Sequence, residues 1–150
     1  MRPVIRLLSL LAAAFILASC SSNQQQIDLA EAQIARFREL MAAREYQQIY
    51  DEGAPVLKQS ATAKAMIDLL TNVQQGRGAF KSAERSGWRV AFNISKSIRV
   101  TLVFAAQFEK GPTTETFVYD IIDGKALLAG YHINYSLPQN KEALPEERRS

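Results

Sequence analysis

The pattern of apolar and polar positions divides the chain into a helical first half and a second half built of strands. From Ile27 onwards, apolar residues recur at intervals of three and four, the spacing of a helix packed along one face. The members of this first series are Ile27, Ala30, Ile34, Phe37 and Met41. The series predicts a helix over residues 24–43. Its charged residues fall mostly on the other faces: Arg36, Arg38, Glu39 and Arg44.

Two shorter helices are predicted after the first. One covers residues 46–52 and ends at Gly53-Ala54-Pro55, because glycine and proline both interrupt helices. The other covers residues 61–75 and ends at Gly76-Arg77-Gly78. Its apolar residues again have helical spacing: Met66, Leu69, Leu70 and Val73.

After Gly78 the apolar period changes to two, which is typical of strands buried on one face. The clearest strand places one alternate set of residues on a single face: Val100, Leu102, Phe104, Ala106 and Phe108. An earlier strand is predicted within residues 80–94, bent near Ser86-Gly87 and followed by a turn near Ser95.

Two more strands complete the pattern, over residues 116–122 and 126–136, after a break at Lys110-Gly111-Pro112. Asp123-Gly124 lies between them and predicts a type I′ hairpin, because that turn needs positive φ at both central positions. The elements together predict an α+β fold, with N-terminal helices packed on one face of a curved antiparallel sheet of about four strands. A single domain over residues 27–137 contains them. Residues 138–150 lack any apolar period and are predicted to be a disordered tail.

The first nineteen residues have the pattern of a signal peptide. Arg2 and Arg6 form a positive start, and residues 7–18 are apolar except for Ser9. This run is shorter than the roughly 20 apolar residues of a membrane-spanning helix. It is followed by a polar stretch without positive charge, residues 21–26. Cleavage and secretion are therefore expected.

The end of this segment, Leu17-Ala18-Ser19-Cys20, resembles the lipobox of bacterial lipoproteins. The resemblance implies that signal peptidase recognises Leu17, Ala18 and Ser19 and cuts before Cys20. It also implies that the Cys20 sulfur carries a diacylglyceryl group and that its new amine is available for a further acyl chain such as palmitate. Two or three acyl chains hold a protein stably on a membrane. Ser21 in the second position resembles the sorting pattern for the outer membrane, on its periplasmic face.

The tether between the acylated cysteine and the domain is expected to be short. The six residues 21–26 that follow Cys20 would reach only about 20 Å even if fully extended, so the domain would lie against the lipid headgroups. Since Cys20 is the single cysteine of the chain, disulfides and cysteine catalysis are excluded for the mature protein. The expected partners are the membrane, through Cys20, and a protein of the cell envelope.

Charge and composition exclude some classes of partner. The sequence is 47% hydrophobic and 22% charged, as in ordinary globular proteins. Cleavage removes two of the 18 basic residues and leaves 16 against 15 acidic residues, so no polyanionic partner and no nucleic acid are expected. Five basic residues of the early strands are interpreted as a solvated face, or alternatively as contacts to anionic headgroups. They are Lys81, Arg85, Arg89, Lys96 and Arg99.

Four short stretches resemble small bacterial lipoproteins of uncharacterised domain families: residues 45–50, 78–82, 114–117 and 123–131. Those families are similar in outline to the nuclear transport factor 2-like and cystatin-like superfamily. The resemblance covers roughly residues 34–135, and the stretches that carry it are structural rather than catalytic. It implies a cone-shaped fold that can enclose a pocket, and no particular activity.

The candidates for chemistry in such a pocket are few: His132, Asp120, Tyr119, Tyr131, Tyr46 and Tyr50. Alternation predicts that Tyr131 faces the helices and that His132 faces away. The helix-facing set of the last strand would be Leu127, Ala129, Tyr131, Ile133 and Tyr135. In the preceding strand, Asp120 falls on the face opposite to Phe117 and Tyr119, so neither His132 nor Asp120 shares a face with the tyrosines.

Each of these residues has two interpretations. Tyr119 and Tyr131 are either core aromatic residues or possible pocket-lining hydroxyl groups. His132 is either a surface imidazole or a general base or interface residue. One histidine and no free cysteine give no pattern for a metal site, and no phosphate-binding loop or nucleophile elbow is present. No catalytic residue and no cofactor are therefore assigned.

Three functions remain open. The leading hypothesis is a non-enzymatic interaction module of the cell envelope, which would show a filled interior and an exposed apolar patch. A binder of a small apolar or amphipathic ligand would show a closed cavity without polar groups. An enzyme would show a buried ionisable pair at a pocket mouth.

Overall fold

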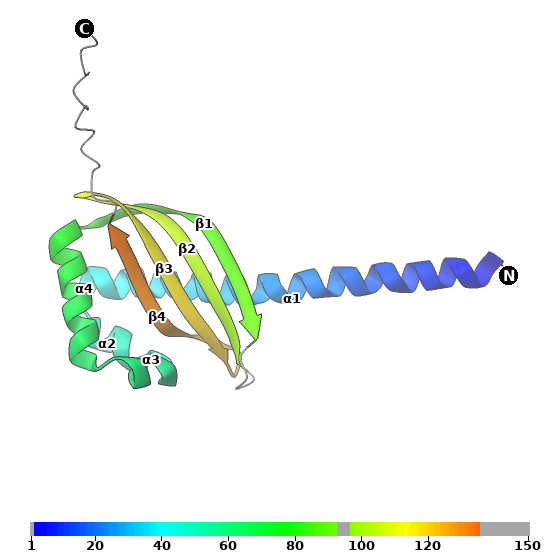
Figure 1. Ribbon diagram of the computed structural model, residues 1–150, viewed down its shortest axis with the longest axis horizontal. Coiled ribbons are helices and arrows are strands. Elements are labelled where there is room, and N and C mark those ends of the chain that lie inside the picture. The colour runs from blue at the N-terminus through cyan, green and yellow to red at the C-terminus, as the bar shows by residue number, and fades with distance from the viewer. Residues whose placement is uncertain (1, 93–96, 136–150) are drawn as a thin grey trace, which may run out of the picture.

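The computed structural model describes the backbone of residues 2–92 and 97–135, and the side chains of residues 23–92 and 97–134. In this part of the chain, helices precede strands (Figure 1). The helices are α1 (Arg2–Ala43), α2 (Tyr46–Asp51), α3 (Pro55–Ser60) and α4 (Ala63–Arg77). The strands are β1 (Phe80–Phe92), β2 (Ile98–Phe108), β3 (Gly111–Ile122) and β4 (Lys125–Tyr135). The α+β prediction is confirmed. The predicted turn near Ser95 and the tail over residues 138–150 lie outside the described residues.

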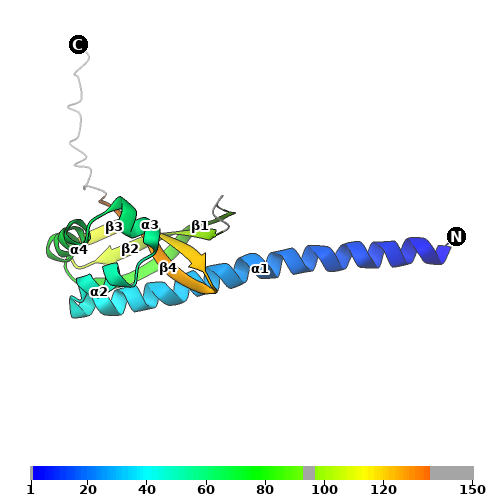
Figure 2. The same cartoon turned by 90° about the horizontal axis from the view of Figure 1, so that it is seen from below.

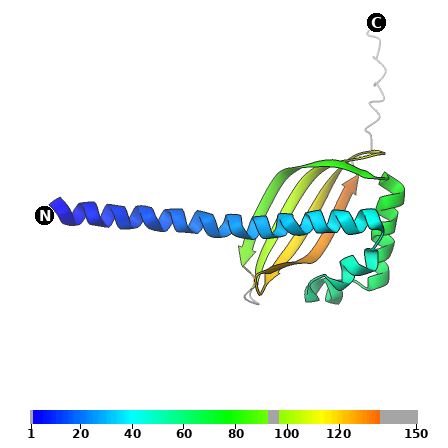
Figure 3. The ribbon, with the colours of Figure 1, turned by 180° about the vertical axis from the view of Figure 1, so that it is seen from behind.

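The four strands form one open, curved sheet in which each strand pairs antiparallel with the next, in the order β1-β2-β3-β4. Alternation places Val100 and Leu102 of β2 and Phe117 and Tyr119 of β3 on one face, where all four are buried. This face is covered by α1, which crosses the sheet (Figure 3), so that helix and sheet form two layers (Figure 2). The core lies between these layers.

The apolar face of α1 packs against the sheet as its spacing predicts. Ile27, Ala30 and Phe37 are buried, and the Phe37 ring lies 5.1 Å from Phe117 and 5.0 Å from Tyr131, centroid to centroid. The shorter helices α2 to α4 lie toward the β4 side of the sheet (Figure 1). Ala54, between α2 and α3, donates its backbone N–H to the Leu128 carbonyl of β4 at 2.8 Å.

The helix α1 begins much earlier than predicted, at Arg2 rather than near residue 24. No glycine or proline occurs between Pro3 and Gly53, and the leucine- and alanine-rich segment has high helix propensity. The Asn23 side chain does not interrupt the helix, because capping residues favour a helix start without forbidding helix on both sides. Residues 20–26, expected to form a short tether, are therefore helical in the structure.

A helix between the second and third predicted ones was missed. Pro55 begins α3 instead of only ending α2, because proline fits the first turn of a helix, where its absent N–H has no partner to lose. The next helix, α4, starts two residues later than predicted. Its N-cap is Thr62, whose hydroxyl accepts a hydrogen bond from the Ala65 N–H at 3.2 Å.

The strand β3 starts at Gly111, five residues earlier than predicted. Pro112 is compatible with this start because pairing of β3 with β4 begins only at Thr113, so no hydrogen bond of that ladder is lost. At the other end of β3, Asp123 and Gly124 have φ of 51° and 73°. Both values are positive, which confirms the predicted hairpin.

A β-bulge in β4 changes which residues face the core. Gly130 pairs with Val118, but Leu128 pairs with Tyr119, so Ala129 is the extra residue. Leu128 and Tyr131 are therefore both buried, whereas Leu127 is only half-buried. The prediction that Leu127 and Ala129 share the face of Tyr131 is wrong. The predictions for Tyr131 as buried and His132 as exposed are confirmed.

Two glycines near the end of α4 give a matched test of the local structure. Gly78 has φ 73° and ψ −157°, a conformation open essentially to glycine alone, and a Cβ there would collide with the Glu109 carboxylate. We expect Gly78→Ala to lower the free energy of unfolding by about 1–3 kcal/mol. Gly76→Ala should raise it by up to about 1 kcal/mol, because Gly76 is helical and nothing lies near its Cβ position. Chemical denaturation measures both, and effects of equal sign would contradict the assigned helix end.

Candidate functional site

A buried charged cluster connects α1 to β3 and β4. Glu115 of β3 is 0% exposed, and the Arg38 side chain of α1 is 15% exposed. Arg38 donates from Nη1 to Glu115 Oε1 at 2.9 Å and from Nη2 to Oε2. The Tyr131 hydroxyl of β4 donates to the same Oε1 at 2.6 Å. One carboxylate thus joins three elements of the fold.

Aromatic rings surround the Arg38 guanidinium. Its central carbon lies 4.0 Å from the ring centroid of Phe80, 5.3 Å from that of Phe117 and 6.0 Å from that of Phe108. These distances allow cation–π attraction. An open pocket of about 240 Å³ adjoins the cluster. Its lining residues are Arg38, Met41, Ala42, Gln74, Ala79, Phe80 and Phe108.

The geometry of the cluster favours a structural role for Glu115. Both of its oxygens already accept hydrogen bonds, and its complete burial keeps it from any molecule that enters the pocket. Burying two charges is costly unless their geometry and hydrogen bonds compensate for lost water. Here the bidentate pair and the Tyr131 hydroxyl provide that compensation. Of the two charged residues, Arg38 lines the pocket and Glu115 does not; Glu115 balances the charge of Arg38.

Tyr119, predicted as a possible pocket-lining residue, borders only a small hollow. Burial raises the pKa of its phenol above the ordinary value, although the positive charge of Arg38 acts in the opposite direction. The phenol is therefore a neutral hydroxyl at physiological pH. The hollow beside it, bounded by α1, α2, β3 and β4, has a volume of about 30 Å³, room for about one or two water molecules.

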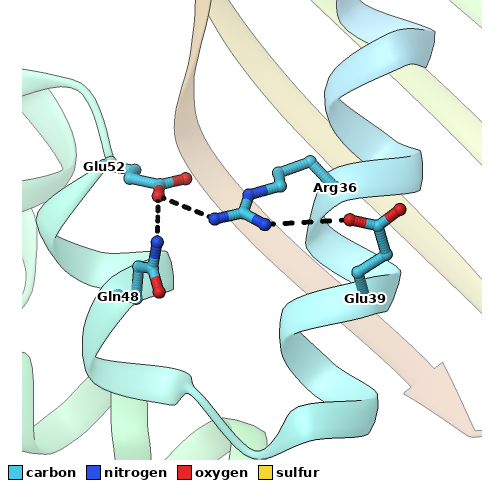
Figure 4. Close-up of polar contacts among 4 residues, drawn as sticks. All are labelled: Arg36, Glu39, Gln48 and Glu52. Carbon is cyan, nitrogen blue, oxygen red and sulfur yellow. Dashed lines mark hydrogen bonds and ion pairs between the residues drawn. The ribbon is translucent and has the colours of Figure 1, made fainter.

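An exposed polar network lies at the rim of this hollow and joins α1 to the end of α2 (Figure 4). Arg36 lies between two carboxylates, 3.3 Å from Glu52 Oε1 and 3.7 Å from Glu39 Oε2. Gln48 donates to Glu52 Oε1 at 2.6 Å. Because these groups are solvent-exposed, their attraction is weak. The network connects α2 to α1 at the surface and offers no enclosed site.

Tyr131, the second possible pocket-lining residue, borders a different hollow. Together with His132 it lies beside an open groove of about 400 Å³ formed with α3 and α4. The Tyr131 hydroxyl bonds to Glu115, and the His132 imidazole is exposed. Tyr119 and Tyr131 therefore do not line one common pocket. Phe117 lies between them, 6.5 Å and 5.1 Å from the two rings.

The opposite face of the sheet carries a second ion pair. Arg99 of β2 donates from Nε and Nη2 to the two carboxylate oxygens of Asp120, at 2.7 and 2.8 Å. Asp120 is buried although no helix covers this face among the described residues. Of the basic residues interpreted as a solvated face, Lys81 and Arg89 are exposed, while Arg99 is engaged with Asp120 and Lys96 lies outside the described residues.

Strand β1 carries the exposed large hydrophobic residues of the described chain. Phe80 is 39%, Trp88 55% and Phe92 79% exposed. Three such residues on one edge strand are unusual, because isolated exposed apolar residues are normal but a gathered set marks an interaction surface. The strand itself was predicted within residues 80–94, but its aromatic residues were not predicted to be exposed.

Sequence reasoning also missed Glu115 and Arg38. Glu115 alternates with Phe117 and Tyr119 and so shares their face, but the strand was predicted to begin only at Thr116. Arg38 was assigned to the polar side of its helix, although it follows Phe37 directly and precedes Met41 by three positions. A longer predicted strand would have identified Glu115 as a charge that needs a buried partner.

The comparisons with known proteins add no family. No protein-family model matches the chain, and no curated protein matches it with significant similarity. Within residues 23–92 and 97–134, no helix is long and apolar enough to cross a membrane, and no three potential metal ligands gather. The predicted lipobox residues, Leu17, Ala18, Ser19 and Cys20, lie in the part of α1 whose side chains are not described.

Proposed function

We propose that this protein is a lipoprotein, anchored through Cys20 on the periplasmic face of the outer membrane, whose domain is a non-enzymatic interaction module. The observation that carries the module is the exposure of Phe80, Trp88 and Phe92 on one edge strand, an apolar surface available for contact with a partner or with the membrane itself. The filled space between α1 and the sheet also supports the interaction module. A cone-shaped fold with a pocket would have its cavity between the helix and the sheet, and here that space is occupied by the rings of Phe37, Phe117 and Tyr131.

The buried pair of Arg38 and Glu115 is a feature expected of an enzyme, but its geometry favours the interaction module. Glu115 has no exposed atom surface, and Arg38 and Tyr131 occupy its oxygens. A general acid or base must come within hydrogen-bond reach of its substrate. The pair is better explained as the contact that fixes α1 on the sheet. The resemblance to the nuclear transport factor 2-like superfamily stays a prediction.

A second candidate is a binder of a small amphipathic ligand in the 240 Å³ pocket beside Arg38. Phe80, Phe108 and Met41 give this pocket apolar walls, and Arg38 and Gln74 give it polar groups. Native mass spectrometry of the protein isolated from its own envelope separates the two proposals. A non-covalent adduct of small mass would support the ligand binder, whereas a complex with a second protein would support the module.

The anchor gives a direct prediction. Wild-type protein should sediment with membranes and carry the mass of its acyl chains, while Cys20→Ser should remain uncleaved and without lipid. The reason is that the thioether forms on the sulfur, and two or more acyl chains make release very slow. Fractionation and mass spectrometry of both proteins provide the measurement. A mature wild-type protein with an unmodified Cys20 thiol would refute the anchor.

A further inference from the structure

The exposed aromatic residues of β1 lie on the same face of the sheet as the core. Trp88 pairs with Leu102, and Phe92 pairs with Ile98, in a ladder where Leu102 is fully buried. The pleat therefore directs Trp88 and Phe92 to the face that α1 covers. Yet they are 55% and 79% exposed, so they lie beyond the cover that α1 provides. They form an apolar strip along the open edge, which we call the Trp88–Phe92 strip.

The strip lies at the end of the domain that is closest to the predicted anchor. Arg38 of α1 lies over Phe80 at the start of β1, and Glu31 pairs with Arg85 at 2.7 Å. Strand β1 therefore runs in the direction opposite to α1, and its later residues lie closer to the N-terminus of α1. Figures 1 and 3 agree that β1 ends close to the point where α1 leaves the sheet.

The anchor is close to the domain because the intervening chain is helical. Cys20 precedes the buried Ile27 by seven residues of α1, a rise of about 10 Å at 1.5 Å per residue. Acyl chains on Cys20 would therefore place a bilayer at this end of the domain. Even a weak contact between the strip and lipid would then be well populated, because the anchor makes it an intramolecular event.

The chemistry of β1 favours a lipid surface over a strand added by another protein. The strand has register shifts between Phe80 and Ser82 and between Arg85 and Gly87, and bulges of this kind hinder edge-to-edge pairing. Its exposed charges hinder pairing as well, and the basic ones outnumber the single acidic Glu84. Tryptophan is enriched at the boundary between headgroups and acyl chains.

We propose that the Trp88–Phe92 strip docks on the lipid headgroup region of the membrane that holds the anchor, and so fixes the orientation of the domain. This inference rests on the proposed lipoprotein anchor for its high local lipid concentration. The affinity of the strip for lipid is a property of β1 itself. The outer face of the sheet, with His132 at its far edge, then stays directed away from the bilayer.

Trp88 is the only tryptophan of the chain, so its fluorescence reports on the strip directly. The acylated protein is reconstituted in vesicles of phosphatidylethanolamine and phosphatidylglycerol, with plain or brominated acyl chains. Interfacial side chains lie about 5–10 Å deep, so brominated lipid should reduce Trp88 emission to roughly half or less. Phe92→Asp, a change at an exposed position, should restore the emission. A reporter moved to the other face, by Trp88→Phe with His132→Trp, should not be quenched.

The possible failures are distinguishable. Protein that floats with the vesicles and shows unquenched Trp88 overturns the docking while the anchor stands. If Trp88 is shielded from solvent only in native envelope membranes, the strip contacts a protein partner. If this shielding grows with protein density in the vesicles, the strip contacts a second copy of the protein. Either result overturns the inference. If the purified protein lacks acyl mass, the anchor fails instead. The single Cys20 thiol can then be coupled to a maleimide lipid, and the same quenching measurement decides the docking.

Discussion

Glu115→Gln is expected to lower the free energy of unfolding by about 3–5 kcal/mol, because it leaves Arg38 as a buried charge without its counter-ion. The substitution keeps the size of the side chain, so the packing around Phe117 changes little. An amide also cannot accept two hydrogen bonds from Arg38 and one from the Tyr131 hydroxyl in the present geometry. Urea denaturation of the two proteins measures the difference.

The matched control is Glu84→Gln on the exposed edge strand β1, where the change should stay within about 0.5 kcal/mol. A double variant, Arg38→Met with Glu115→Leu, should recover much of the lost stability, because an apolar pair avoids the cost of buried charge. If Glu115→Gln were as mild as Glu84→Gln, the ion pair would not be closed to solvent in solution. The structural role assigned to Glu115 would then be wrong, and an accessible carboxylate would favour the enzyme hypothesis.

Tyr131→Ala should lower the free energy of unfolding by about 3–5 kcal/mol, since truncating a buried aromatic residue opens a cavity. The ring packs against Phe37 and Phe117, and its hydroxyl is one of the hydrogen-bond donors to Glu115. Tyr131→Phe separates the two contributions: it keeps the ring and should cost about 1.5–3 kcal/mol for the lost bond to a charged group. Equilibrium denaturation, with circular dichroism to check the fold, measures each variant.

His132→Ala is the control from the neighbouring position, and it should be nearly silent because the imidazole is exposed. A register error of one residue would exchange the two results, because successive residues of a strand point to opposite faces. The same variant also bears on function. The test is whether a folded His132→Ala protein restores the envelope phenotype of a strain that lacks the gene. Failure to do so would point to a site in the groove between β4 and α4, and the interaction module at β1 would lose support.

Local signals determined most of the secondary structure of this protein. The alternation from Val100 to Phe108 matches β2, and the apolar spacing from Ile27 to Met41 matches the face of α1 that is buried. Asp123-Gly124 predicted its hairpin correctly because turn type depends on the φ values of two residues alone. These features need no information from distant parts of the chain.

Contacts between distant segments decided the rest. Arg38 and Glu115 are 77 positions apart, so neither residue by itself indicates the pair. The extra residue Ala129 shifts the faces of β4 beside Leu128, whose carbonyl accepts a hydrogen bond from Ala54 between two helices. Alternation is broken wherever such a bulge occurs. The glycine inside the strand, Gly130, is a local sign of it, but a glycine alone does not fix which residue is the extra one.

The exposure of Trp88 and Phe92 depends on tertiary structure in the same way. Their register against Leu102 and Ile98 places them on the face of β1 that continues the core, where burial would be expected. Whether a strand face is covered depends on how far the helix above it extends across the sheet, and α1 leaves these two residues open. The sequence by itself therefore determined most of the elements and, away from the bulge in β4, their alternate faces. Only the tertiary packing decided which faces meet solvent and which charges are paired, with α1 pairing Arg38 with Glu115 and strand β2 pairing Arg99 with Asp120.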